Sequence, residues 1–124
     1  MTVEESLKIL YIEDDPDAFI FLKTILERKI QKNIEIIWSP TGKEALKILR
    51  RQQMDLIFLD FLLPDIDGIK IIEKIREEGI IVPIVMITGR GGEEIAAEAF
   101  KKGVIDYMVK NYENINELER CLHS

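Results

Sequence analysis

Short apolar runs alternate with longer amphipathic stretches along the chain, five times over. The apolar runs have the length of β-strands and span residues 7–12, 34–38, 54–59, 82–87 and 105–109. The amphipathic stretches have the apolar spacing of helices and span about 16–29, 41–51, 67–78, 92–102 and 115–122. In the fourth of these helices, Ala99 and Phe100 are expected on the buried face. The alternation predicts an α/β fold, in which a parallel sheet with right-handed crossovers carries helices on both faces.

The composition of the runs predicts their order in the sheet. The first, third and fourth runs are the most continuously apolar, as expected for central strands that are buried on both faces. Glu35 and Asp106 interrupt the second and fifth runs, so these two are expected at the edges. The predicted fold is a doubly wound, flavodoxin-like (βα)5 arrangement with strand order 2-1-3-4-5. Its functional crevice is expected beyond the carboxyl ends of the first and third strands.

Residues at the ends of the predicted helices support these boundaries. Asp15 stands before Pro16, which is the pattern of an N-cap followed by proline at the first helical position. Thr41 and Glu44 have the spacing of a capping box. The remaining ends are assigned to one N-cap aspartate and to two glycines in the left-handed conformation: Asp67, Gly79 and Gly103.

Composition bounds the class of protein. A chain of 124 residues, 47% hydrophobic and 32% charged, predicts one globular domain over residues 1–124. The net charge of −6 argues against direct binding of nucleic acid. The one cysteine cannot form an internal disulfide, which fits a reducing compartment. The longest charge-free apolar stretch, residues 80–87, is far shorter than the ~20 residues of a membrane helix. We therefore expect a cytoplasmic protein that does not insert into membranes.

Acidic residues directly follow the first and third strands. Glu13, Asp14 and Asp15 come after the first strand, and Asp60 comes after the third. Because these strands are expected to be neighbours, the carboxylates should converge at one edge of the sheet, where their like charges repel. A hard divalent cation such as Mg²⁺, which prefers oxygen ligands, would relieve that repulsion. Asp15 is better explained as the solvated helix cap.

A hydroxyl and an ammonium group follow the other two strands on that side of the sheet. Thr88 ends the fourth strand, and Lys110 comes directly after the fifth. Together with a metal bound by carboxylates, they would surround a dianionic group with positive charge and hydrogen-bond donors. The set of strand ends therefore predicts a site for a phosphoryl group.

Four segments together resemble the receiver domain of bacterial response regulators, the phosphorylated component of two-component signalling. The segments read ILYIEDD (9–15), DLIFLDFLLPDIDG (55–68), TG (88–89) and GVIDYMVK (103–110). The resemblance covers nearly the whole chain. The superfamily that it indicates is that of chemotaxis-regulator-like domains. It implies that Asp60 accepts a phosphoryl group from the phosphohistidine of a sensor histidine kinase or of a histidine phosphotransfer protein.

The resemblance also implies a bound Mg²⁺, or Mn²⁺ in its place. The expected ligands are Asp14, Asp60 and the backbone carbonyl of Leu62. Glu13 is expected to reach the metal mostly through water.

The same resemblance assigns the signalling residues. Lys110 is expected to contact the phosphoryl group, and Thr88 is expected to move toward it. Tyr107 matches the family's aromatic switch, which turns inward as the threonine moves. The fourth helix, fifth strand and fifth helix would then present the altered surface to a downstream effector protein.

This phosphorylation-activated switch is expected not to be an enzyme, beyond assisting its own phosphorylation and dephosphorylation. Two other functions share part of its pattern. A phosphatase of the haloacid-dehalogenase type also uses an aspartate at a strand end, but it typically needs a second aspartate two residues later, where this chain has Leu62. A receiver-like module that binds partners without phosphorylation would be expected to lack Asp60, Asp14 or Lys110, and all three are present.

Overall fold

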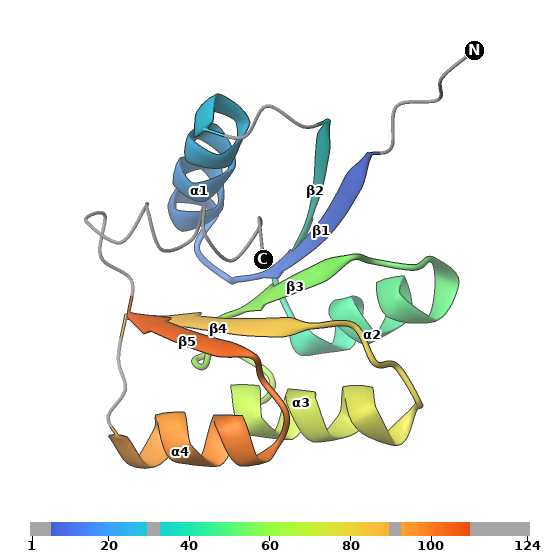
Figure 1. The fold of residues 1–124 in the computed structure, drawn as a ribbon, viewed down its shortest axis with the longest axis vertical. Coiled ribbons are helices and arrows are strands. Elements are labelled where there is room, and N and C mark those ends of the chain that lie inside the picture. The colour runs from blue at the N-terminus through green and yellow to red at the C-terminus, as the bar shows by residue number, and fades with distance from the viewer. Residues whose placement is uncertain (1–5, 30–32, 90–92, 110–124) are drawn as a thin grey trace.

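Five parallel strands form one sheet in the order β2-β1-β3-β4-β5, as predicted. A computed structural model describes residues 6–29, 33–89 and 93–109 of the chain (Figure 1). The strands are β1 (Leu7–Ile12), β2 (Ile34–Ser39), β3 (Leu56–Leu59), β4 (Ile84–Thr88) and β5 (Asp106–Val109). The helices are α1 (Pro16–Lys29), α2 (Gly42–Arg51), α3 (Gly68–Glu77) and α4 (Glu93–Lys101). The predicted helix at 115–122 lies outside the described residues.

Each face of the sheet has its own apolar core, because successive side chains of a strand point to opposite faces. In β1, Ile9 and Tyr11 belong to the core under α1, whereas Leu10 and Ile12 belong to the core under α2, α3 and α4. Figure 1 shows α1 on one side of the sheet and the other three helices on the opposite side. The doubly wound arrangement expected from the sequence is therefore present.

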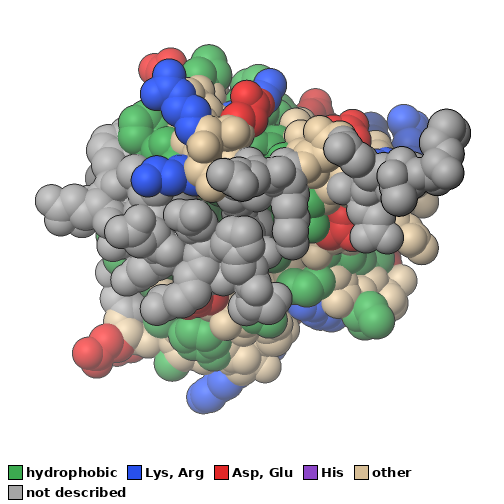
Figure 2. Space-filling model, turned by 45° about the horizontal axis from the view of Figure 1, so that its top comes forward, with side chains coloured by type: hydrophobic (Ala, Val, Ile, Leu, Met, Phe, Trp, Pro, Cys, Tyr) green, Lys and Arg blue, Asp and Glu red, His purple; other side chains and the backbone are tan. Residues whose placement is uncertain are grey.

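Charged side chains of both signs lie on the surface. Figure 2 shows them intermixed with apolar side chains on the face that is turned to the viewer. Lys102 Nζ lies 3.0 Å from Glu73 Oε1 and so connects the end of α4 to α3. An exposed pair of this kind contributes little to stability, typically under about 1 kcal/mol. None of the helices described here has both the length and the apolar character needed to cross a bilayer.

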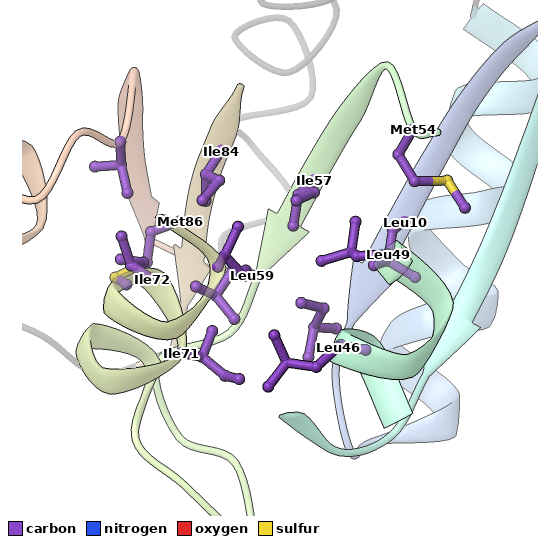
Figure 3. Packing of buried hydrophobic residues seen from close by; sticks show 14 of the residues in the cluster. Leu10, Leu46, Leu49, Met54, Ile57, Leu59, Ile71, Ile72, Ile84 and Met86 are labelled. Atoms are coloured by element: carbon purple, nitrogen blue, oxygen red, sulfur yellow. The ribbon is translucent and has the colours of Figure 1, made fainter. Parts of the chain in front are cut away.

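The larger of the two cores lies between the sheet and the helices α2, α3 and α4, and α3 contributes the most buried isoleucines. Ile71, Ile72 and Ile75 of α3 are fully buried in this cluster. Figure 3 shows Ile71 and Ile72 on the side of the sheet that carries Leu59 and Met86 of the central strands. Burying one such side chain contributes roughly 1.5–3 kcal/mol relative to leaving it in water. This packing fixes α3, and with it the loop that connects β3 to α3.

The inward face of α4 is narrower than expected. Ala99 is fully buried, but Phe100 is 49% exposed, so its expected place on the buried face was wrong. Helix α4 has nine residues and lies beside the edge strand β5. Because one residue step turns about 100° around a helix axis, the neighbour of a buried alanine falls outside so narrow a contact.

The three predicted N-caps and the two glycines predicted in the left-handed conformation are confirmed. The side chains that accept hydrogen bonds from the first-turn N–H groups are Asp15 for α1, Thr41 for α2 and Asp67 for α3. Gly79 and Gly103 follow α3 and α4 with φ angles of 79° and 102°. These angles lie in the left-handed region that favours glycine.

In addition to Thr41, an aspartate from a distant loop caps α2. The N–H groups of Gly42 and Lys43 each donate to the Asp65 carboxylate at 3.0 Å. Partial burial alone would raise the pKa of Asp65, but the hydrogen bonds from backbone N–H groups outweigh it and hold the pKa below its ordinary value. Asp65 belongs to the β3–α3 loop, so this contact connects α2 to the loop that follows Asp60.

We expect Asp65→Ala to lower the free energy of unfolding by about 1 kcal/mol at neutral pH, because it removes an acceptor from the first turn of α2. A carboxyl whose pKa is depressed on folding stabilises the fold above its unfolded pKa, and this contribution is lost as the pH falls through the folded pKa. The difference between variant and wild type should therefore shrink as the pH falls below about 4, the ordinary pKa of an aspartate, as measured by urea unfolding.

Glu77→Ala is the control, since Glu77 is an exposed acid on α3. It should leave stability within about 0.5 kcal/mol of wild type at each pH. A loss in Asp65→Ala that stays the same at both ends of the pH range would contradict the role of the Asp65 charge.

Candidate functional site

The acidic residues that follow β1 and β3 converge at the carboxyl edge of the sheet. Backbone hydrogen bonds extend the strand pairing by one residue, with Glu13 N donating to Ser39 O and Asp60 N donating to Ile12 O, both at 2.9 Å. As a result, Glu13, Asp14 and Asp60 each offer a carboxylate oxygen to a cluster whose ligand atoms all lie within 4.8 Å of one another. The convergence expected from the sequence is therefore present.

The three carboxylates differ in their exposure to solvent. Glu13 is 0% and Asp60 5% exposed, whereas Asp14 is exposed. Taking carboxylates out of water is costly unless hydrogen bonds or a cation compensate. An all-oxygen set with one member open to solvent is the donor chemistry that Mg²⁺ prefers. The residues present therefore fit a hard divalent cation.

Protein groups hold Glu13 at both its side chain and its backbone. The Tyr11 hydroxyl donates to Glu13 Oε2 and the Asp15 N–H donates to Oε1, each at 3.2 Å. Trp38 Nε1 donates to the Glu13 carbonyl oxygen at 2.5 Å, and its ring stacks on Phe19 with centroids 5.4 Å apart. Burial, and then the Glu13 charge, raise the pKa of Tyr11 far above its ordinary value, so the phenol remains a donor.

The loop after β3 holds Asp60 in place. The Leu62 N–H donates to Asp60 Oδ1 at 3.3 Å, and Leu62 pairs with Asp67 in an antiparallel bridge. The Gly68 N–H donates to Phe61 O at 2.8 Å. A Cβ at Gly68 would lie 2.9 Å from Phe61 Cα and 3.2 Å from Asp60 O, so the start of α3 approaches the backbone of the site very closely. The Leu62 side chain is 47% exposed beside Asp60.

Of the other predicted site residues, the structure describes Thr88 and Tyr107 but not Lys110. Thr88 ends β4, two residues after Met86, which pairs with Leu59 directly before Asp60. Tyr107 lies in β5 and is half-buried against the larger core. Its hydroxyl is buried and has no hydrogen-bond partner among the described residues, and burial raises its pKa. Lys110 lies outside the described residues.

The sequence of residues 9–122 matches the model of one protein family, the response regulator receiver domain. The chain belongs to this family. It is 33% identical over 105 residues to the alkaline phosphatase synthesis transcriptional regulatory protein PhoP of Bacillus subtilis strain 168, covering 85% of this chain and 42% of PhoP. It is 36% identical over 107 residues to the transcriptional regulatory protein SrrA of Staphylococcus aureus strain NCTC 8325 / PS 47, covering 86% of this chain and 43% of SrrA. The chain thus spans less than half the length of these relatives.

Solved structures agree with the family. The receiver domain of the Francisella response regulator 1452 superposes with a TM-score of 0.83 at 29% identity, covering 94% of this chain and 93% of that one. A CheY-like response regulator receiver domain protein from Methanospirillum hungatei JF-1 has a TM-score of 0.81 at 25% identity, covering 96% and 92%.

The receiver domain is a phosphorylation-activated switch of two-component signalling. Domains of this family are signalling modules rather than enzymes in general. Neither alternative weighed from the sequence, the haloacid-dehalogenase-type phosphatase or the phosphorylation-independent module, gains support from these relatives.

We expect Gly68→Ala to destabilise the fold by about 1–3 kcal/mol, because the new Cβ would be forced against the backbone of Phe61. Alanine is otherwise the better helix former by up to about 1 kcal/mol, so without the close contact the substitution would raise the free energy of unfolding, and with the contact it lowers it. Urea unfolding measures it, with Lys70→Ala on the exposed side of the same helical turn as the control. A neutral or stabilising Gly68→Ala would show that α3 does not approach the site this closely.

Proposed function

We propose that Asp60 accepts a phosphoryl group from the phosphohistidine of a sensor histidine kinase or a histidine phosphotransfer protein. The observation that carries the proposal is the buried Asp60 carboxylate, clustered with Glu13 and Asp14 within 4.8 Å at the carboxyl edge of the sheet. The hydrogen bond from the Leu62 N–H to Asp60 Oδ1 limits the orientations of the nucleophile.

In the proposed transfer, an Asp60 carboxylate oxygen forms a bond to phosphorus while the phosphorus–nitrogen bond of the phosphohistidine breaks. The electron pair of the broken bond returns to the imidazole nitrogen, and the phosphoryl group is held on Asp60 as an acyl phosphate. Hydrolysis reverses the state of the switch. A water oxygen bonds to phosphorus, the bond to the Asp60 oxygen breaks, and the carboxylate is regained with release of inorganic phosphate.

We assign the metal to the same cluster. Glu13, Asp14, Asp60 and the backbone carbonyl of Leu62 would hold Mg²⁺, or Mn²⁺ in its place, with Glu13 acting mostly through water. When bound, the cation neutralises charge on the phosphoryl oxygens. The exposed position of Asp14 leaves the cluster open to solvent, which suits a cation that keeps several of its waters.

Lys110 and Thr88 are proposed to contact the phosphoryl group from the ends of β5 and β4. Movement of Thr88 would vacate space for the Tyr107 ring. The half-buried Tyr107 supports this role, since a buried hydroxyl without a partner among the described residues is a costly arrangement that a second ring position can relieve.

The face formed by α4, β5 and the predicted fifth helix is proposed to bind a downstream effector protein. In its described part, large apolar side chains are exposed to solvent: Phe100, Ile105 and Val109. Exposed apolar side chains that gather on one surface are typical of protein interaction sites.

The wider setting is inferred from charge and from the relatives. PhoP and SrrA are transcriptional regulators, but the net charge of −6 argues against binding of DNA by this domain itself. We propose that residues 1–124 form one receiver domain that works in the cytoplasm and acts through protein partners.

Acetyl phosphate should add one phosphoryl group to the wild-type protein in the presence of Mg²⁺ and none after treatment with EDTA. Asp60→Asn should remain unlabelled, because the amide is a poor nucleophile. Intact-mass spectrometry measures both. Asp15→Asn is the matched control, because it removes a neighbouring exposed carboxylate but keeps an oxygen to cap α1. Equal labelling of wild type and Asp60→Asn would mean that the acceptor is another residue.

Leu62→Asn should shorten the lifetime of the phosphorylated form a few-fold, which corresponds to well under ~2 kcal/mol of barrier. The half-exposed Leu62 side chain offers no hydrogen bond and is proposed to shield the neighbouring Asp60 from water, whereas asparagine can orient an attacking water. Loss of the label is followed after the donor is removed, with Leu62→Met as a control that stays apolar. Unchanged decay in Leu62→Asn would show that other residues control the access of water.

A further inference from the structure

We propose that Tyr11 is a positioning residue of the metal site, acting through Glu13. Its phenol and the indole of Trp38 hold Glu13 in the orientation that the cation requires. This inference rests on the proposed function, since it assumes that the acidic cluster binds Mg²⁺.

Glu13 needs such support because its side chain is longer and more flexible than that of aspartate. Fixing a glutamate side chain costs up to about 2 kcal/mol of conformational entropy. Glu13 is fully buried, so its carboxylate must also replace the hydrogen bonds of water with hydrogen bonds to protein groups. A carboxylate already fixed in this way adds little further ordering cost when a cation binds.

Tyr11 provides a rigid donor to that carboxylate. Tyr11 and Glu13 are two residues apart along the β1 direction, where alternate side chains point to the same face. The Tyr11 ring contacts the Phe19 and Phe58 rings, at centroid distances of 6.3 Å and 6.1 Å, and its hydroxyl donates to Glu13 Oε2 at 3.2 Å. The Asp15 N–H donates to Oε1, so each carboxylate oxygen has a protein donor.

The edge strand β2 holds the backbone of Glu13. Trp38 Nε1 donates to the Glu13 carbonyl oxygen at 2.5 Å, and Glu13 N donates to Ser39 O at 2.9 Å. Phe19 of α1 contacts both aromatic donors, since its ring stacks on Trp38 and lies beside Tyr11. Side chain and backbone of Glu13 are therefore fixed by one aromatic group of Tyr11, Phe19 and Trp38.

A merely structural tyrosine would affect stability but not the affinity of the folded protein for the metal. The experiment therefore measures the Mg²⁺ dissociation constant by isothermal titration calorimetry. A fluorescence titration measures the same constant independently, because Trp38, the only tryptophan, lies beside Glu13. Tyr11→Phe should raise the constant about ten-fold, as loss of a hydrogen-bond partner of a metal-site carboxylate typically does. The same substitution in a Glu13→Gln background should add no further change.

Ile9→Val is the matched control, because Ile9 is buried in the same core and on the same face of β1 as Tyr11. It should lower stability and leave the Mg²⁺ dissociation constant at the wild-type value. Three results would overturn the inference while the proposed function stands: an unchanged constant in Tyr11→Phe, an equal weakening in Ile9→Val, or a full additional loss in the Glu13→Gln background. Failure of the wild type to bind Mg²⁺ would overturn both the metal site and the inference.

Discussion

Two carboxylates, Glu13 and Asp60, are withdrawn from water at the junction of β1 and β3, within reach of a third, Asp14. Desolvation and like-charge repulsion both act against this arrangement, so the remainder of the fold must supply the free energy that maintains it. The strand order brings the carboxylates close together in space. Because β1 and β3 are neighbours, residues 47 positions apart in sequence (60 − 13) are brought together by pairing of the main chain alone. The apolar packing of α3 supplies stabilising free energy, since its fully buried isoleucines fix the helix that starts close behind Asp60.

The strand order and the acidic cluster could be predicted because each depends on local signals. An edge strand is marked by its own charged residue, and a parallel sheet brings all carboxyl ends to one side whatever the loops do. N-caps such as Thr41 and Asp67 could be predicted for the same reason, because the capped N–H lies three residues away. Phe100 was misplaced because the width of a helix contact depends on neighbouring elements, and the sequence of α4 does not contain that information.

The unpredicted contacts span long sequence distances or depend on a side-chain direction. Asp65 caps α2 from 23 residues away, and Trp38 reaches the Glu13 carbonyl across 25 residues. No periodicity encodes such pairs, because they follow from how loops pack after the strands are in place. The Tyr11–Glu13 contact did leave a signal. Two residues at positions i and i+2 of a strand share a face, so a tyrosine two positions before a strand-end glutamate is placed to donate to it.

The two sides of the site differ in how completely their polar groups are satisfied. On the β1 side, the Tyr11 hydroxyl, the Trp38 indole and the Glu13 carboxylate all have hydrogen-bond partners, and the rings around them are packed against one another. On the β5 side, the buried Tyr107 hydroxyl has no partner within the described residues. A polar network in which every group has a hydrogen-bond partner favours one arrangement. A buried hydroxyl without a partner raises the free energy of its conformation, which reduces the free-energy difference between this conformation and a second side-chain position. The proposed switch uses both properties, since its phosphoryl site would keep its geometry while Tyr107 changes position. Two strands, β3 and β4, separate them, with the fixed aromatic group over β1 and β2 and Tyr107 on the opposite edge strand β5.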